Sequence, residues 1–196
     1  ILESLSFKTS FGIDRLTTKS NSFGPNFLKR TENSNGEAEI QTLDALTWLN
    51  ENTLTFDQNF GENHQVNALL GFTMQQFSNE TLSAVAFDFP DGRTGWHDLG
   101  AAQNPQNPGN SERAWSMLSY IGRVNYSLHD KYLCTLTGRV DGSSKFAEGN
   151  KYGVFPSGAV AWRVTEEPFM QDIDFISNLK IRASYGKIGN QSIAPY

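Results

Sequence analysis

Residues 118–128 read Leu-Ser-Tyr-Ile-Gly-Arg-Val-Asn-Tyr-Ser-Leu, and this stretch decides the fold. Its even positions are apolar or small. Most of its polar residues stand at the odd positions: Ser119, Arg123, Asn125 and Ser127. A period of two places successive side chains on opposite faces of a β-strand. The same alternation recurs over 132–140 and 152–164. The pattern therefore predicts three strands that each have one apolar and one polar face.

These runs are longer than the strands of most soluble proteins. Each covers 9 to 13 residues, whereas a soluble strand usually has about 5–6. A strand that crosses a bilayer at a tilt needs roughly 9–11 residues. Because only every second residue of such a strand meets lipid, it needs no continuous apolar segment. The length and the alternation together predict the wall of an outer-membrane β-barrel.

Four further runs of the chain show the same alternation. They span 4–17, 43–57, 64–77 and 179–187. Together with the first three runs, they predict an all-β fold, an antiparallel meander of about seven long strands.

The connections between the predicted strands alternate in length. The long ones span 18–42, 78–113 and 141–151, and the short ones span 58–63 and 129–130. Outer-membrane barrels have short turns on the periplasmic side and longer loops outside, and a soluble sandwich gives no reason for this order. The connection at 166–178 is the exception, because it is long where a short turn is expected.

Aromatic residues support the membrane interpretation. Tyr126 and Tyr132 flank the tight turn at 129–130 on the apolar parity, and Trp162 lies close to the next connection. Amphipathic rings of this kind form the aromatic girdle at a membrane interface. The core of a β-sandwich also favours Tyr and Trp, so the rings favour the barrel without excluding the sandwich.

Four arginines stand on the polar parity, one on each of four successive strands: Arg123, Arg139, Arg163 and Arg182. An arginine on the lipid face at the bilayer midplane costs about 2–4 kcal/mol, so we predict that these four face the lumen. Three roles are open. They contact a substrate, hold an internal plug by pairing with its carboxylates, or form a structural ladder with neighbouring acids and waters.

Composition excludes several classes of function. The net charge of −5 and the lack of a Lys/Arg-rich run argue against a nucleic-acid partner. The single cysteine, Cys134, excludes an internal disulfide. No glycine-rich phosphate loop, nucleophile elbow or Cys/His metal pattern is present. We therefore predict no enzyme activity, no catalytic residue, no metal and no cofactor.

The richest polar stretch lies in the longest connection, at 88–98. It holds three aspartates and His97 within eleven residues. Pro90 and two glycines interrupt it, and its spacing matches no metal cage. We predict a loop that folds over a ligand, with Trp96, His97 and Asp98 as the candidate contact residues.

Several blocks resemble the SusC/RagA-type TonB-linked outer-membrane transporters of Bacteroidetes-like bacteria. The blocks are Leu118–Tyr126, Asp130–Leu133, Arg139–Phe146, Phe155–Ser157, Ala161–Val164, Glu166–Met170, Leu179–Gly186 and Gly189–Gln191. The resemblance covers essentially the whole chain and is densest over 115–191. The stretches 18–42 and 78–113 match the family poorly, which leaves the identity of the ligand open.

The resemblance implies a 22-stranded type of barrel that is plugged by an N-terminal domain. It also implies import of oligosaccharides or peptides with energy from TonB. A SusD-like surface lipoprotein would act as a lid, and this lid is a second candidate partner of Trp96. Residues 1–196 would then be a partial barrel domain in the bacterial outer membrane, in contact with lipid and without the plug, the TonB box and the signal peptide. Seven strands leave two unpaired edges, so the isolated piece should neither span a membrane stably nor stay soluble.

Two alternatives remain open at this point. A soluble β-sandwich that binds carbohydrate would bury the apolar face against a second sheet. An outer-membrane barrel protease would bring acidic residues and His97 together at the outer rim.

Overall fold

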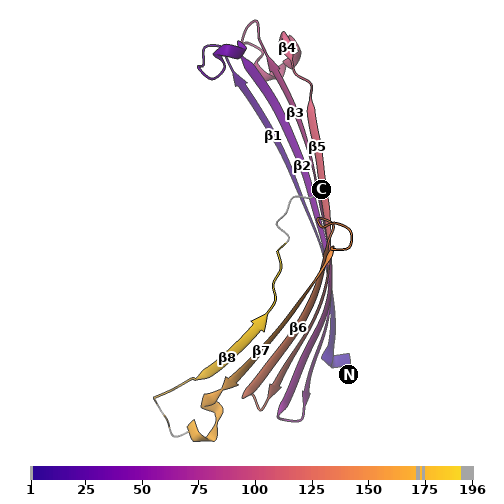
Figure 1. The fold of residues 1–196 in the computed structure, drawn as a ribbon, viewed down its shortest axis with the longest axis vertical. Helices are drawn as coiled ribbons and strands as arrows, with labels where there is room; N and C mark the ends of the chain where they lie inside the picture. Colours follow the sequence, from indigo (N-terminus) through magenta and orange to yellow (C-terminus); the bar gives the residue numbers. More distant parts are fainter. Residues whose placement is uncertain (1, 171–172, 174, 191–196) are drawn as a thin grey trace. The chain divides into compact units, whose positions relative to one another are not determined.

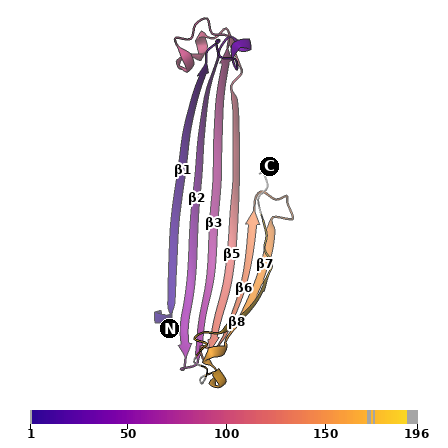
Figure 2. The same ribbon diagram turned by 90° about the vertical axis from the view of Figure 1, so that its left-hand side faces the viewer.

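The computed structural model describes residues 2–170, 173 and 175–190. Its strands form one sheet in the order β1-β2-β3-β5-β6-β7-β8, and the short β4 pairs with β3 (Figure 1, Figure 2). Their bounds are β1 Leu5–Gly24, β2 Glu37–Phe60, β3 His64–Phe87, β4 Asn104–Pro105, β5 Gly109–Leu128, β6 Tyr132–Ser143, β7 Tyr152–Arg163 and β8 Lys180–Gly186. Long strands that are consecutive in sequence lie side by side, which confirms the all-β antiparallel meander.

Short 3₁₀ helices stand between the strands. They are η1 Leu2–Ser4, η2 Glu32–Ser34, η3 Gly95–His97, η4 Leu99–Ala101, η5 Val164–Glu166 and η6 Pro168–Met170. The last two occupy the long connection between β7 and β8. Among the described residues, none of the helices is long and apolar enough to cross a membrane.

The predicted bounds of four strands were wrong. The strands β1, β2, β3 and β5 have 20 to 24 residues each, and they take in much of 18–42 and 78–113, which we expected to be loops. The connections shrink to 25–36 and 88–108. The extension of β1 escapes a pattern search because its residues are polar on both parities, as in Thr17–Ser22. A paired strand with water on both faces needs no apolar alternation, since the ladder satisfies its backbone groups.

The chain divides into two compact units. The belt unit comprises Ile1–Gly12, Leu49–Gln76 and Trp115–Tyr196, and the loop unit comprises Ile13–Trp48 and Phe77–Ala114. Four strands, β1, β2, β3 and β5, contribute residues to both units.

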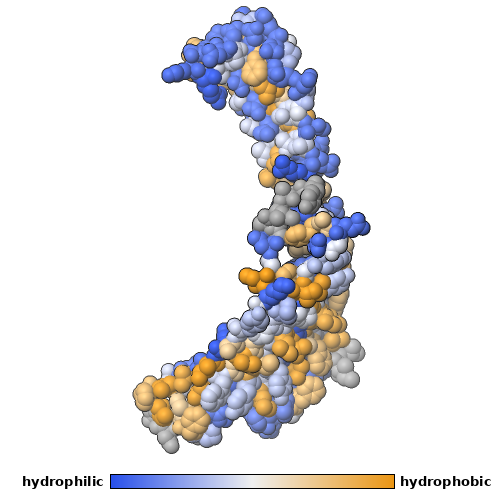
Figure 3. All heavy atoms as spheres, in the orientation of Figure 1, coloured by the Kyte–Doolittle hydropathy of each residue, from blue (hydrophilic) through white to orange (hydrophobic). Residues whose placement is uncertain are grey.

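The belt unit has one continuous apolar face. The register pairs Val124 with Leu136 across β5 and β6, and Leu136 with Gly158 across β6 and β7. Because directly opposed residues point to the same face of a sheet, the apolar residues of these strands form one continuous surface. Val124 is 45% exposed, Leu136 61% and Val160 57%, and apolar side chains gather over β6, β7 and β8 in Figure 3. The described strands contain no second sheet that would bury this face, which counts against the soluble sandwich.

The loop unit has a small buried core. Ala38, Ala86 and Phe89 are buried, and the partly buried residues Phe23, Trp96, Leu99 and Ala102 pack against them. The rings of Phe23 and Phe89 meet edge to face, with their centroids 5.5 Å apart. The face of this unit that Figure 3 shows is mostly hydrophilic. The loop unit therefore combines a small buried core with a polar surface on that face.

Hydrogen bonds hold the two connections of the loop unit together. Thr31 is fully buried, and its hydroxyl donates to the carbonyl of Pro25 at 2.6 Å. Asp88 has a positive φ of 65°; its backbone N–H donates to the carbonyl of Ser34 at 2.9 Å, and its carboxylate accepts from the Asn35 amide at 2.7 Å. The connections 25–36 and 88–108 therefore form one folded surface.

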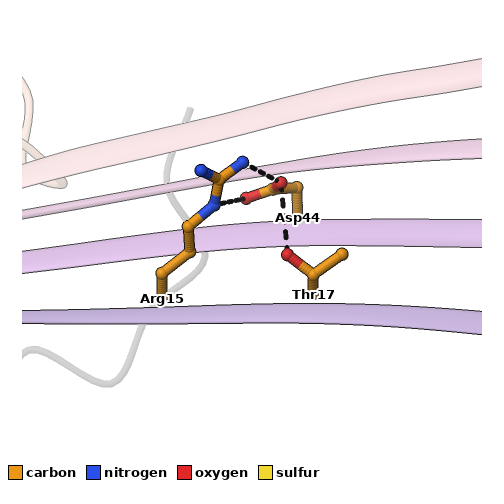
Figure 4. Close-up of polar contacts among 3 residues, drawn as sticks. All are labelled: Arg15, Thr17 and Asp44. Atoms are coloured by element: carbon orange, nitrogen blue, oxygen red, sulfur yellow. Dashed lines mark hydrogen bonds and ion pairs between the residues drawn. The ribbon is translucent and has the colours of Figure 1, made fainter.

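An exposed polar cluster joins β1 and β2 within the loop unit (Figure 4). The Nη2 of Arg15 lies 2.6 Å from Oδ2 of Asp44, and its Nε donates to Oδ1 at 3.1 Å. The hydroxyl of Thr17 donates to the same carboxylate at 3.4 Å. An ion pair this exposed contributes little to stability, but it fixes which residues of the two strands lie beside one another.

Candidate functional site

The structure places all four arginines on one polar face of the belt unit. Arg123 stands opposite Thr137, and Arg139 stands opposite Phe155. Arg163 stands opposite Lys180, and Arg182 opposite Ala161. The apolar residues of the same strands point to the other face, as the alternation predicted. That this polar face lines a lumen stays a prediction, because seven long strands are only part of a barrel.

The contacts of the four arginines differ. Nε of Arg139 donates to both carboxylate oxygens of Asp141, at 2.7 and 2.8 Å, and its Nη2 lies 3.4 Å from the hydroxyl of Ser119. Nε of Arg123 donates to the hydroxyl of Thr137 at 3.3 Å. These contacts agree with a structural role for Arg139, in which it pairs with a neighbouring acid. Arg123 has no ionic partner among the described residues, which leaves its charge available to a ligand.

A hollow of about 620 Å³ lies on this polar face. Its lining combines Arg123, Arg139, Asn150, Phe155 and the segment 186–190. The segment is held by the backbone N–H of Lys187, which donates to the carbonyl of Pro156 at 3.0 Å. A Cβ at Gly189 would overlap the ring of Phe155, so the close approach requires glycine. Guanidinium, amide and aromatic groups together suit a large polar ligand.

Trp96, His97 and Asp98 are neighbours in space, but two of them have local structural roles. The ring of Trp96 packs against the core of the loop unit and stacks on His97, with centroids 4.5 Å apart. The carboxylate of Asp98 accepts from the backbone N–H of Gly100 at 3.0 Å. The side chain of His97 is exposed. Contact of these residues with a ligand or a lid stays a prediction.

The aspartates of this connection do not converge. Asp88 is bound to Asn35, and Asp91 forms an ion pair of 2.8 Å with Arg93. Hydrogen bonds from the Arg93 guanidinium hold the pKa of Asp91 below its usual value. Within the described part of the chain, no three His, Cys, Asp or Glu side chains are grouped so that they could hold a metal ion. The aspartates of 88–98 therefore do not gather around His97, as the proposed active site of a barrel protease would require.

The predicted girdle residues meet at one end of the belt unit. Tyr132 stands opposite Trp162, and both line a second hollow together with Tyr126. The Tyr132 hydroxyl donates to Oε1 of Glu167 at 2.6 Å, and the Trp162 indole donates to the same oxygen at 3.0 Å. Nζ of Lys131 lies 3.5 Å from the other oxygen. One acidic side chain thus ties the two rings to the β7–β8 connection.

The hydrogen bond from Tyr132, and next the one from Trp162, hold the pKa of Glu167 below its usual value. Reasoning from the pattern gave Glu167 no role, because it stands outside the alternating runs. A second omission is Phe27, which is 81% exposed in the connection between β1 and β2. Neither residue carries a periodic signal, so only spatial neighbours reveal it.

Comparison with known proteins agrees with this geometry. The family model described as TonB dependent receptor-like, beta-barrel, matches residues 3–196. TonB-dependent receptor P26 of Formosa agariphila is 41% identical over 194 residues, which are 96% of this chain and 19% of that protein. TonB-dependent receptor SusC of Bacteroides thetaiotaomicron is 47% identical over 78 residues, which are 40% of this chain and 8% of SusC.

A solved structure of the RagAB peptide transporter superposes with a TM-score of 0.89 at 23% identity, over 99% of this chain and 22% of that one. It supports the fold. Nearly all of this chain aligns with curated relatives such as TonB-dependent receptor P26, but it spans only about a fifth of their length. These relatives are receptors and not enzymes, in agreement with the absence of a predicted catalytic site. From the apolar and polar faces of the sheet and the match over 3–196, we conclude that the chain belongs to the TonB-dependent receptor β-barrel family.

Proposed function

We propose that this chain forms part of the wall of an outer-membrane importer that takes up bulky nutrients with energy from TonB. The observation that carries the proposal is the pair of faces on the belt unit. One face exposes apolar side chains, with Leu136 61% exposed, and the other carries the arginines and a hollow of about 620 Å³. Transport then proceeds by capture and release of the ligand, with no covalent step.

The proposed place in the membrane has a direct test on the full-length protein. Single cysteines are placed at 118–128 in a Cys134→Ser background and spin-labelled. We expect labels at 118, 120, 124 and 126 to be accessible to oxygen, and those between them to meet a water-soluble relaxation agent or protein. Labels at the even sites that are shielded from both reagents would show that the apolar face is buried in protein, against the proposal.

Uptake is the second test. A strain that depends on the full-length protein for growth on one oligosaccharide or peptide mixture should lose that growth when TonB is deleted. Arg123→Gln should reduce uptake, because the side chain lines the hollow and has no ionic partner among the described residues. Lys8→Gln, at an exposed position outside the hollow, is the control. Equal growth with and without TonB would contradict the proposed energy source.

The substrate class is proposed at the level of bulky oligosaccharides or peptides. A hollow with arginine, asparagine and aromatic groups suits both, since a ring can stack on a sugar and a guanidinium can bind a carboxylate or hydroxyl groups. RagAB, whose structure this chain resembles, is a peptide transporter. Competition between a labelled oligosaccharide mixture and a labelled peptide mixture for uptake by the full-length protein would decide between the two classes.

We also propose that a SusD-like surface lipoprotein docks on the loop unit. Phe27 and Leu28 are 81% and 42% exposed, and the connection that carries them is anchored by the buried Thr31. A rigid exposed aromatic side chain is typical of an interface anchor. Phe27→Ala should weaken co-purification of the lipoprotein with the full-length protein. Phe60→Ala, at an exposed phenylalanine of the belt unit, should leave it unchanged.

A further inference from the structure

Three cationic residues gather on the polar face of the belt unit, where β7 ends and β8 begins. Arg163 stands directly opposite Lys180 in the antiparallel register. Arg182 stands two residues beyond Lys180, on the same face and opposite Ala161. Directly opposed residues of a sheet face have Cβ atoms about 4.5–5.5 Å apart, and diagonal neighbours lie about 7–8 Å apart. The three positive groups are therefore within reach of one small anion.

No described acidic side chain neutralises this cluster. The buried Glu167 is nearby in sequence, but its Oε1 already accepts from Tyr132 and Trp162, and its Oε2 faces Lys131 at 3.5 Å. The ion pairs of the described residues include none of the three cations of the cluster. Like charges directly opposite one another weaken a sheet, so this arrangement is unfavourable unless an anion binds.

The surrounding charges point the same way. The whole chain has a net charge of −5. On the belt-unit part of β5 and on β6, β7 and β8, however, the polar face carries five cationic residues and one acidic residue. They are Arg123, Arg139, Arg163, Lys180 and Arg182, with Asp141 as the acid. Asp141 is already bound by Arg139. This face is therefore complementary to negative charge, although the chain as a whole is acidic.

We propose that Arg163, Lys180 and Arg182 form an oxyanion-binding site that takes a carboxylate, sulfate or phosphate group. Guanidinium groups bind such oxyanions through two parallel hydrogen bonds, and an ammonium group adds a compact charge. The oxyanion comes either from an acidic side chain of the full-length protein outside residues 1–196 or from a free anionic ligand. The site follows from the strand register, and it goes beyond the transport proposal and does not depend on it.

The first experiment measures thermal unfolding of the full-length protein in detergent against sodium sulfate, with sodium chloride at equal ionic strength as reference. A free-ligand site predicts a saturable rise in Tm with sulfate, because a ligand that binds the native state stabilises it. Arg163→Gln/Arg182→Gln should weaken the apparent sulfate affinity by about tenfold or more. Lys8→Gln, at an exposed position of β1 outside the cluster, should keep the wild-type response. If the double variant does not fold, Lys180→Gln is measured in its place.

The second experiment identifies an internal source of the oxyanion. Carbodiimide joins a carboxylate to a lysine amine without a spacer, and mass spectrometry of the digested full-length protein locates the bond. A cross-link from Lys180 to an acid outside residues 1–196 supports the site and assigns the oxyanion to the protein itself. Lys180→Arg should abolish that cross-link while keeping the charge, because a guanidinium does not form the amide.

Two results would overturn the proposal. A cross-link from Lys180 to Glu166, Asp172 or Asp174 would show that the adjacent connection neutralises its own cations. The second result combines two findings: the wild type and Arg163→Gln/Arg182→Gln respond equally to sulfate, and Lys180 forms no cross-link to an acid outside residues 1–196. Together they would show that no oxyanion binds at the cluster.

Discussion

The belt unit and the loop unit use the same strands in opposite ways. In the belt unit, large apolar side chains such as Leu136 stay exposed at 61%, and the polar residues occupy the other face. In the loop unit, Phe89 is buried at 3% exposure, and the strand surfaces carry polar contacts such as Arg15–Asp44. The difference shows that strand geometry is independent of the solvent, whereas the placement of apolar residues is set by it.

The two units should therefore fail in different ways. Under the proposed function, the belt unit depends on lipid against its apolar face and on neighbouring strands along its edges. The loop unit depends on a small core and on buried hydrogen bonds, as a water-soluble protein does. Substitutions that act on one unit and spare the other test this separation.

The largest effect is expected for Phe89→Ala. It removes the central ring of the loop unit, where Phe23 packs edge to face at 5.5 Å. Loss of a buried phenylalanine costs about 3–5 kcal/mol. Hydrogen exchange of the full-length protein should then show faster exchange in 25–36 and 88–108, with no change in β6 and β7. Phe27→Ala, at an 81% exposed position, is the control; uniform acceleration in both units would contradict their separation.

Leu136→Arg should have the second largest effect, in the belt unit. Its side chain is 61% exposed and stands opposite Val124 on the apolar face. A lipid-facing arginine near the bilayer midplane costs about 2–4 kcal/mol. Unfolding of the full-length protein by denaturant in lipid vesicles measures the loss. Ser157→Arg, on the polar face of β7 and opposite the uncharged residues Thr137 and Gly186, is the matched control. An equal loss there would show that the faces are assigned wrongly.

Thr31→Val should have a smaller effect that is confined to the loop unit. It keeps the shape of a fully buried side chain but removes the hydroxyl that donates to the Pro25 carbonyl at 2.6 Å. A buried group left without its partner costs about 1–3 kcal/mol. Limited proteolysis of the full-length protein within 25–36 should become faster. The exposed Thr18→Val on β1 provides the reference, and an unchanged cleavage rate in Thr31→Val would argue against the anchoring role.

The smallest effect is expected at the girdle end of the belt unit and depends on pH. Hydrogen bonds from Tyr132 and Trp162 lower the pKa of Glu167 below its ordinary value of 4.5. A lowered native pKa means that the contribution to stability is complete above pH 4.5 and is lost as the pH falls through the native pKa. The Tm of the full-length protein should therefore fall more than that of Glu167→Gln as the pH is lowered from 4.5 toward about 2. Equal falls would leave Glu167 without a role in the pH dependence.

Much of the belt unit was predictable because its pattern is local. The alternation over 118–128 and 132–140 gave the two faces correctly, and the structure pairs these strands in one register. The tight turn was also predicted; His129 and Asp130 both adopt positive φ there, and the backbone N–H of Lys131 donates to the carbonyl of Leu128 at 3.0 Å. The sequence also placed Tyr132 and Trp162 near one interface, and the strand register then sets them opposite one another.

The loop unit was predicted poorly for a physical reason. The β1 residues that lead to Gly24 are mostly polar and exposed on both parities, so this extension leaves no periodic mark. Its core joins Ala38 to Phe89, which are far apart in the sequence, through hydrogen bonds around Asp88. The candidates Trp96 and Asp98 were chosen for their chemistry, and the structure shows that packing and a local hydrogen bond also account for them.

The sequence by itself determined the strand class, the two faces and the family, because a period of two and the motif blocks are written along the chain. Only the tertiary structure decided which charges meet. The register alone places Arg163 opposite Lys180, and the fold of the β7–β8 connection alone brings Glu167 to Tyr132 and Trp162. Periodicity fixes the direction of a side chain relative to its own strand, whereas its neighbours depend on how separate strands pair.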